Sequence, residues 1–263
     1  MSEKLLSAAE SDRLLESAWS YFARQLPDGH VMPSPGVLIA NGRSPLPFMN
    51  AAILTDVVVD ADDLRRRVGA AREQFEPLGL QWILMFPEDR TPSSVDVAGI
   101  CGEAKLQYMM PMRGMVTDAL AAPVRTLPAL DLRVVEDAAG RQAVADLNAA
   151  GYGIPTEIVR PATEPASMWS QMVGVVGYVD GEPVSTASVA AVDDVAYVAL
   201  VATSPAYQGR GYAEAVMRDA LGQARNRWGV TRTILHATPA GAPVYTRMGY
   251  EDVGGYHVYV SGE

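Results

Sequence analysis

The sequence predicts an α/β (α+β) protein with two similar lobes, in each of which helices flank a mixed central sheet. Three observations support this fold class. Segments with the two-residue period of strands alternate with segments of helical period along the chain. Both halves follow a similar order, α-β-β-α-β-α-β in the first and β-α-β-β-β-α-β-α-β in the second. A stretch without periodicity, ALAAPVRTLPAL (119–130), contains two prolines and separates the halves.

We place the domain boundary in this stretch. An N-terminal domain then covers 1–125 and a C-terminal domain covers 129–263. The chain of 263 residues is long enough for two small domains, and its 49% of hydrophobic residues can fill their cores. The similar order of elements predicts an internal repeat of the fold with little shared sequence.

In the first half, the apolar residues of 5–25 follow helical spacing and predict a helix. PDGHVMPSPG then breaks the pattern, and VLIAN and FMNAAILT predict two strands on either side of a turn-rich segment. The later elements of this half are a polar, arginine-rich helix (61–76), a buried strand (LQWILMF), a short helix (PSSVDVAGICGEA) and a strand (LQYMMPMRGMV).

The second half begins with a strand (LDLRVV) and a helix (137–149), and the following segment (150–169) is predicted to be irregular. Asp180-Gly181 joins QMVGVVGYV to EPVSTASVAAV and is a strong hairpin signal. The next strand, VAYVALVAT, is apolar on both faces and is predicted to be central. The closing elements are an amphipathic helix ending at Gly229, a strand (TRTILHA), a short helix (PAGAPVYTRM) and a last strand (YEDVGGYHVYV).

Composition excludes several classes of function. A formal net charge of -10 disfavours general binding to nucleic acid or to an anionic membrane. One cysteine, Cys101, allows no disulfide within the chain and fits a reducing compartment, and three histidines offer no metal-binding spacing. No apolar run approaches the about 20 residues of a membrane span. We therefore expect a cytoplasmic protein without metal, nucleic acid or membrane partners, and the sequence is compatible with a homodimer.

The loop between the central strand and the amphipathic helix, SPAYQGRGYAEAVM (204–217), places glycines directly before a helix. Such a loop can bring backbone amides against an anion. A dinucleotide site fits poorly, because Glu214 occupies the third glycine position of the G-x-G-x-x-G motif. A P-loop is rejected, because no Gly-Lys-Ser/Thr sequence lies near. An ordinary glycine-containing turn is the structural alternative.

A third interpretation rests on two motifs taken together, which are Gln208-Gly209-Arg210-Gly211-Tyr212-Ala213 and, later in the chain, Tyr245-Thr246-Arg247-Met248-Gly249-Tyr250. In this order of strands and helices, the pair resembles the GNAT superfamily of acyl-CoA-dependent N-acetyltransferases over about residues 130–260. The first half has the same order of elements without the glycine motif. It resembles the degenerate lobe of a tandem-GNAT protein, so the resemblance implies a tandem GNAT-like fold.

The resemblance implies acetyl-CoA as a cosubstrate and no metal. In the family, loop amides bind the pyrophosphate of coenzyme A, and free amides of the central strand bind the pantetheine arm and the acetyl carbonyl. The corresponding positions are Val201, Ala202 and Thr203 on the strand, and Gln208, Gly209, Arg210, Gly211, Tyr212 and Ala213 in the loop. An ordinary core strand is the alternative for the first three positions.

For catalysis, the resemblance implies Tyr245 as the general acid toward the leaving thiolate, and a structural aromatic residue is the alternative. Some family members carry a glutamate base on the central strand, where this chain has Tyr197. Glu157 and Glu164 lie in the segment expected to border the acceptor site and are the candidate bases.

The activity implied is transfer of an acetyl group from acetyl-CoA to a primary amine of a small molecule or protein. The alternative is a non-catalytic acyl-CoA-binding or regulatory module that keeps the motif without a competent base. The acidic net charge favours a cationic acceptor.

Overall fold

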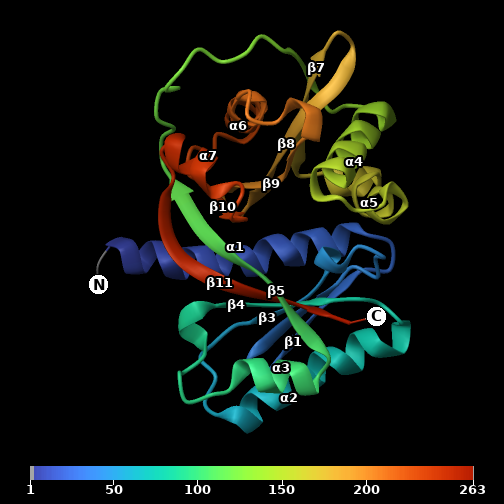
Figure 1. Cartoon of the computed structure of the whole chain (residues 1–263), viewed down its shortest axis with the longest axis vertical. Coiled ribbons are helices and arrows are strands. Elements are labelled where there is room, and N and C mark those ends of the chain that lie inside the picture. The colour runs from blue at the N-terminus through green and yellow to red at the C-terminus, as the bar shows by residue number, and fades with distance from the viewer. Residues whose placement is uncertain (1–2, 263) are drawn as a thin grey trace. The chain divides into compact units, whose positions relative to one another are not determined.

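The computed structural model describes residues 3–262, with side chains from residue 7 onward (Figure 1). Packing divides the chain into two compact units. Unit 1 contains Met1–Met115, His236–Ala242 and Asp252–Glu263, and unit 2 contains Val116–Leu235 and Pro243–Glu251. The domain limits expected from the sequence, 1–125 and 129–263, stay a prediction, because a packing unit is not necessarily a functional domain.

Unit 1 contains a mixed sheet with the strand order β1-β2-β3-β4-β11-β5. β1, β2 and β3 are antiparallel, β4 is parallel to β3, and β11 is antiparallel to β4. The elements, two of which extend beyond the unit, are α1 (Glu3–Gln25), β1 (His30–Ser34), β2 (Val37–Asn41), β3 (Asn50–Leu54), α2 (Ala61–Phe75), β4 (Ile83–Pro87), α3 (Val97–Glu103), β5 (Leu106–Thr117) and β11 (Glu251–Ser261).

Unit 2 contains strands in the order β10-β9-β8-β7-β6. Neighbouring strands are antiparallel from β6 to β9, and β10 is parallel to β9. The elements, two of which extend beyond the unit, are β6 (Asp131–Val134), α4 (Ala138–Tyr152), α5 (Thr156–Thr163), β7 (Met172–Val179), β8 (Glu182–Val192), β9 (Val195–Thr203), α6 (Tyr212–Trp228), β10 (Thr233–Ala237) and α7 (Ala242–Arg247).

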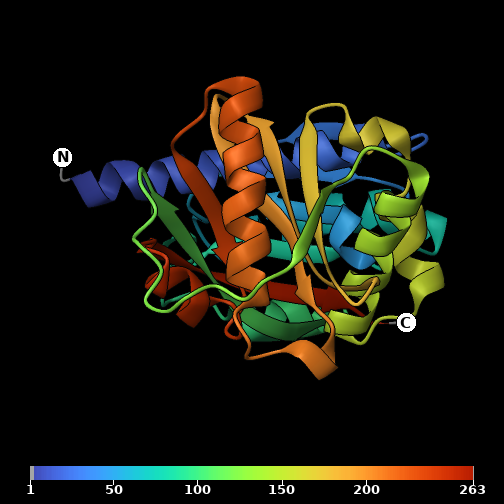
Figure 2. The same cartoon turned by 90° about the horizontal axis from the view of Figure 1, so that it is seen from above.

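The two units share one arrangement, in which antiparallel strands lead into a β-α-β crossover through α2 in unit 1 and through α6 in unit 2. In unit 2, α6 and the pair α4–α5 cover opposite faces of the strands (Figures 1 and 2). Val176 packs with Val144 of α4, whereas a Cβ on its neighbour Gly177 would lie 2.9 Å from Val216 of α6. The predicted mixed sheet flanked by helices is therefore confirmed.

Unit 1 has a large core of its own, in which Phe75 of α2 stacks on Trp82 with ring centroids 5.4 Å apart. One local prediction was wrong, and one strand was not predicted. The segment 150–169 is not irregular, because α5 forms there with Val159 and Ala162 buried, although Pro161 lies inside the helix. The segment that breaks the helical pattern after residue 25 contains β1, and its Pro33 is tolerated because β1 is the edge strand of the order.

Candidate functional site

β9 contains a bulge at the positions predicted for the central strand. Opposite β8, Thr186 pairs with Ala202 and Ser188 with Ala199, so Leu200 and Val201 together face one residue of β8. Leu200 has φ 52, a left-handed conformation that is strained for a side chain of this type. Such bulges redirect a strand and are frequent next to functional sites.

The other edge of β9 is open beyond the bulge. β10 pairs with β9 at Ala196 and Tyr197, and among the described residues it has no pairing with the stretch Val198–Thr203. This edge of β9 is therefore not covered by β10 at Val201, Ala202 and Thr203, whose role in coenzyme binding stays a prediction.

The carbonyl groups of this stretch already have protein partners. The Tyr152 hydroxyl donates to the Val201 carbonyl at 3.2 Å. The Ser185 hydroxyl donates to the Ala202 carbonyl at 3.1 Å, and the Gln208 amide to the Thr203 carbonyl at 3.2 Å. The carbonyl groups of Val201, Ala202 and Thr203 are thus already engaged by side chains. The sequence analysis missed Tyr152, because a tyrosine at the end of a helix carries no signal for such a contact.

The loop before α6 presents the uncapped start of a long helix. Gly211 is the N-cap residue with φ 89, and no side chain caps the helix there. Gly209 also has a positive φ, of 73. Glycine adopts these angles without strain, and the amides of an uncapped first turn attract anions. Tyr212 and Ala213 are the first residues of α6.

The polar side chains of the loop are turned toward the loop itself. Arg210 donates to the Ala206 carbonyl at 2.9 Å and lies over the Tyr207 ring, 5.2 Å from its centroid. The first turn of α6 contains a carboxylate, Glu214, which is 5% exposed. Arg218 neutralises it with hydrogen bonds of 2.9 and 2.8 Å. This pairing leaves the positive potential of the helix start unopposed.

Tyr245 lies on α7 and is 9% exposed, with its ring edge-on to Tyr250 at a centroid distance of 6.0 Å. Burial raises the pKa of Tyr245, and the hydroxyls of Tyr152 and Tyr250 raise it further. Tyr245 is therefore a neutral phenol at physiological pH and can donate a proton or a hydrogen bond.

The two candidate bases lie apart from the other site residues. Glu157 is exposed on the first turn of α5. A carboxylate oxygen of Glu164 is 3.6 Å from Arg160, which also forms two 2.9 Å hydrogen bonds with Asp146. Among the described side chains, neither glutamate contacts another predicted site residue. Tyr197 is 2% exposed and burial raises its pKa well above the usual value, so it is no substitute for a glutamate base.

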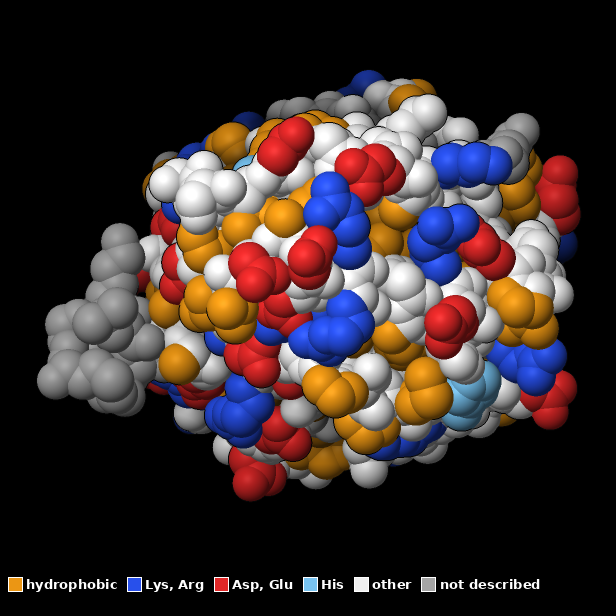
Figure 3. Space-filling model, turned by 90° about the horizontal axis from the view of Figure 1, so that it is seen from below, with side chains coloured by type: hydrophobic (Ala, Val, Ile, Leu, Met, Phe, Trp, Pro, Cys, Tyr) orange, Lys and Arg blue, Asp and Glu red, His pale blue; other side chains and the backbone are white. Residues whose placement is uncertain are grey.

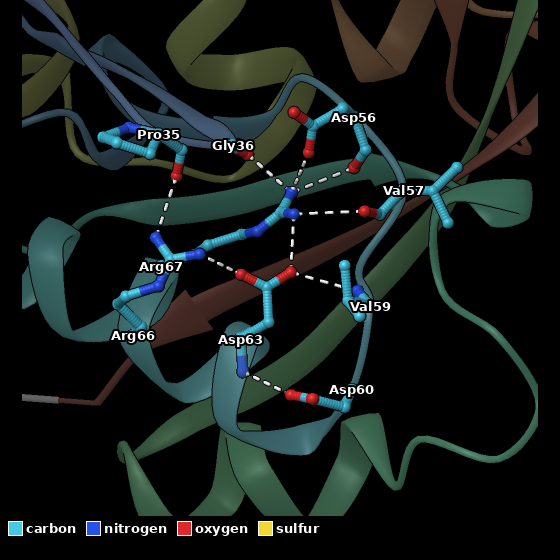
Figure 4. Close-up of polar contacts among 9 residues, drawn as sticks. All are labelled: Pro35, Gly36, Asp56, Val57, Val59, Asp60, Asp63, Arg66 and Arg67. Carbon is cyan, nitrogen blue, oxygen red and sulfur yellow. Dashed lines mark hydrogen bonds and ion pairs between the residues drawn. The ribbon is translucent and has the colours of Figure 1, made fainter.

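The corresponding helix start in unit 1 is built differently. Asp60 caps α2 and accepts from the Asp63 amide at 2.9 Å, while Asp63 accepts from the Val59 amide at 3.0 Å (Figure 4). The buried guanidinium of Arg67 donates to Asp63 at 2.6 Å and to the Val57 carbonyl at 3.1 Å. The carboxylates of Asp60 and Asp63 thus already accept hydrogen bonds from backbone amides at the start of α2. Binding of a further anion there is disfavoured.

Other classes of site are not seen. Between residues 3 and 262, no group of three or more His, Cys, Asp and Glu side chains could hold a metal ion. None of the helices described is long and apolar enough to cross a membrane. Figure 3 shows acidic and basic side chains interspersed on one face of the molecule. Exposed ion pairs such as Arg65–Glu103 at 2.9 Å are typical of a solvated surface.

Part of the chain matches a family model, and the whole chain resembles several solved structures. Residues 144–250 match the model of the Acetyltransferase (GNAT) family. Among solved structures, a GCN5-related N-acetyltransferase from Kribbella flavida has a TM-score of 0.70 and 20% identity, with 96% of each chain covered. A tandem GNAT protein from the clavulanic acid biosynthesis pathway has a TM-score of 0.51 and 12% identity, with 89% of this chain and 78% of that chain covered. Comparison with curated protein sequences gives no match.

Proposed function

We propose that the chain transfers an acetyl group from acetyl-CoA to a primary amine of a small molecule or a protein, because residues 144–250 match the GNAT family model and a solved GCN5-related N-acetyltransferase has a similar fold. The observation that carries this proposal is the uncapped, glycine-rich start of α6, next in the chain to the open edge of β9. An anion-binding helix start and free strand amides suit the two ends of an acyl-CoA thioester.

In this proposal, the loop Gln208–Ala213 binds the pyrophosphate, and Val201, Ala202 and Thr203 bind the pantetheine arm and the thioester carbonyl through their backbone. The bulge at Leu200 supports this role, because it turns the strand where its pairing with β10 has ended. Hydrogen bonds to the carbonyl oxygen stabilise the negative charge that develops there when the amine attacks.

Tyr245 is the proposed general acid. As the C–N bond forms and the C–S bond breaks, the sulfur leaves as a thiolate and takes a proton or a hydrogen bond from the phenol. Glu157 and Glu164 remain the proposed bases for the amine proton, and the ion pair with Arg160 makes Glu164 the weaker candidate. The proposal includes a cytoplasmic location, which the single buried thiol of Cys101 supports.

The test is turnover. Purified protein is incubated with acetyl-CoA and a panel of cationic small amines and lysine-containing peptides, and both free thiol and the mass gain of the amine are measured. We expect stoichiometric release of thiol and acetylated amine with at least one acceptor, and no turnover with Gly211→Val. Glu157→Gln and Glu164→Gln in the same assay rank the two bases.

The alternative, a non-catalytic acyl-CoA-binding module, is favoured by one observation, which is that no carboxylate contacts the open edge of β9 among the described residues. It predicts tight binding of acetyl-CoA without acetylation of any amine in the panel. Absence of acetyl-CoA binding would contradict both functions.

A further inference from the structure

The segment 118–130, which we call the strap, passes across the first turn of α6 (Figure 2). Both the strap and α6 belong to unit 2. A Cβ built on Gly211 would lie 3.1 Å from Nη2 and 3.4 Å from Nε of Arg125, and 3.4 Å from Cδ of Pro128. The guanidinium of Arg125 is therefore in contact with the residue that opens α6.

The strap is anchored on both sides of Arg125. On one side, the Ala121 amide donates to the Met248 carbonyl at 2.8 Å, and Arg218 donates to the Ala121 carbonyl at 2.7 Å. On the other side, Leu130 packs against β7, where a Cβ on Gly177 would lie 2.9 Å from its Cδ1. Two prolines between these anchors stiffen the strap. The position of Arg125 over Gly211 is thus fixed by the fold of unit 2.

Arg125 has no polar side-chain partner among the described residues. It is exposed, and the described residues offer it neither a hydrogen bond nor an ion pair. The nearby cation of the loop, Arg210, is instead bonded to the Ala206 carbonyl and lies over Tyr207. In a chain with a net charge of -10, an arginine without a polar partner among the described residues, held beside an uncapped helix start, is suited to binding an anion.

We propose that Arg125 of the strap binds the diphosphate of coenzyme A when the loop Gln208–Ala213 holds it. This inference rests on the proposed function and adds a ligand-binding residue from outside the glycine motif. A guanidinium can form two parallel hydrogen bonds with phosphate oxygens, and these bonds are stronger than neutral ones. The strap thereby contributes to coenzyme affinity in addition to joining the two halves of the sequence.

Titration calorimetry with coenzyme A and with dephospho-coenzyme A, which lacks the 3′-phosphate, tests the assignment. The proteins are wild type, Arg125→Ala, Arg125→Lys and the control Arg225→Ala. Arg225 is exposed in the last turn of the same helix, so both alanine variants remove one positive charge. We expect Arg125→Ala to weaken both ligands by about 5- to 20-fold, Arg125→Lys to weaken them less, and Arg225→Ala to match wild type.

Several results would overturn the assignment. Equal affinity of wild type and Arg125→Ala for coenzyme A, or tighter binding by Arg125→Ala, would show that Arg125 is not a phosphate ligand. If Arg125→Ala lost affinity for coenzyme A but not for dephospho-coenzyme A, Arg125 would bind the 3′-phosphate and not the diphosphate. Equal losses of coenzyme affinity in Arg125→Ala and Arg225→Ala would show that the change in net charge, and not a direct contact of Arg125, causes the effect. These outcomes leave the proposed function intact, whereas no binding of coenzyme A by wild type would contradict both.

Discussion

Tyr245 and Tyr250 are two buried tyrosines of unit 2 for which we expect different roles. Tyr245→Phe removes the proposed proton donor and keeps the packing of the ring. We expect kcat to fall by roughly 10- to 1,000-fold, while the KM for acetyl-CoA changes little. Steady-state kinetics at saturating acetyl-CoA, on an acceptor found in the turnover assay, measures this effect.

Tyr250→Phe is the matched control for this substitution. The Tyr250 hydroxyl lies 2.8 Å from the Thr233 hydroxyl, and burial raises its pKa as it does that of Tyr245. Its loss should lower the free energy of unfolding by about 1 kcal/mol and leave kcat unchanged. Full kcat in Tyr245→Phe, with chemistry shown to limit the rate, would exclude Tyr245 as the acid.

Glu16 is expected to make the free energy of unfolding depend on pH. Burial raises its pKa to about 7, Arg90 lowers it in part, and the charges of Asp12 and Asp56 raise it. The stability linked to this group is fully present below its ordinary pKa of 4.5 and is lost as the pH rises through about 7. Glu16→Gln should therefore stabilise the protein by about 1 to 3 kcal/mol at pH 8 and have little effect at pH 4.5. Urea unfolding at the two pH values measures the difference, and an equal effect at both would refute it.

The residues of the site differ in how far the sequence reveals them. The glycines of the loop are visible because positive φ angles favour a particular residue type, and Gly209 and Gly211 adopt such angles. Tyr152 and Arg125 are not visible, because their contacts with Val201 and Gly211 arise only when distant segments fold together. The strained φ of Leu200 leaves no trace in the sequence, since a leucine is unexpected at such an angle.

At the scale of elements, the start of α2 depends on one buried ion pair. Arg67 and Asp63 have side chains that are 4% and 9% exposed, and Arg67 joins α2 to the segment 56–57 and to Gly36 (Figure 4). Arg67→Met removes the buried partner of Asp63 and leaves this carboxylate with the more exposed Arg66. We expect a loss of about 3 kcal/mol in the free energy of unfolding, measured by urea denaturation at pH 7.

The neighbouring Arg66 provides the control, because it pairs with the same carboxylate of Asp63 but its own side chain is 56% exposed. Arg66→Met should change stability by no more than about 0.5 kcal/mol. The hydrogen bond from Arg67 lowers the pKa of Asp63, so the stability linked to Asp63 is present above about pH 4 and is lost as the pH falls further. This acid-dependent component should be smaller in Arg67→Met, in which Arg66 and the Val59 amide still stabilise the Asp63 carboxylate. Equal losses in the two variants would contradict a special role for the buried pair.

The elements themselves were predicted where the period was clear. The crossover helices α2 and α6 and the hairpin at Asp180-Gly181 follow regular patterns and turn signals. α5 was missed because its prolines suggest a break, whereas the burial of Val159 and Ala162 outweighs that local preference. The length over which β9 and β10 pair could not be predicted from the sequence. No local sequence pattern marks the residue at which two parallel strands separate.

At the scale of the whole molecule, the two units have related folds but different helix starts. The start of α2 is capped by Asp60 and occupied by Asp63, whereas the start of α6 is uncapped. Hydrogen–deuterium exchange with and without acetyl-CoA should therefore show slower exchange in residues 198–216 and no change in residues 55–66. Slower exchange confined to residues 55–66 would place the coenzyme in unit 1 and would contradict a binding site in unit 2.

The repeated order of elements was readable from the sequence, and the solved GNAT structures with similar folds agree with it. The position of the last strand in unit 1 could not be predicted from the sequence. β11 pairs with β4, which is far from it in the sequence, and neither strand carries a signal for its partner. Pairings between distant segments depend on the global fold, which local patterns do not specify.

The most direct test of the central claim compares two glycines at the two ends of α6. Gly211 and Gly229 have φ of 89 and 73, so a valine at either position imposes similar backbone strain of about 1 to 2 kcal/mol. Only Gly211 lies in the proposed phosphate loop. In calorimetric titration with acetyl-CoA, we expect Gly229→Val to keep the wild-type Kd. We expect Gly211→Val to weaken binding by about 100-fold or more, because its side chain would displace Arg125 and distort the proposed phosphate loop. Equal affinities of both variants for acetyl-CoA, or no binding by the wild-type protein, would contradict the account.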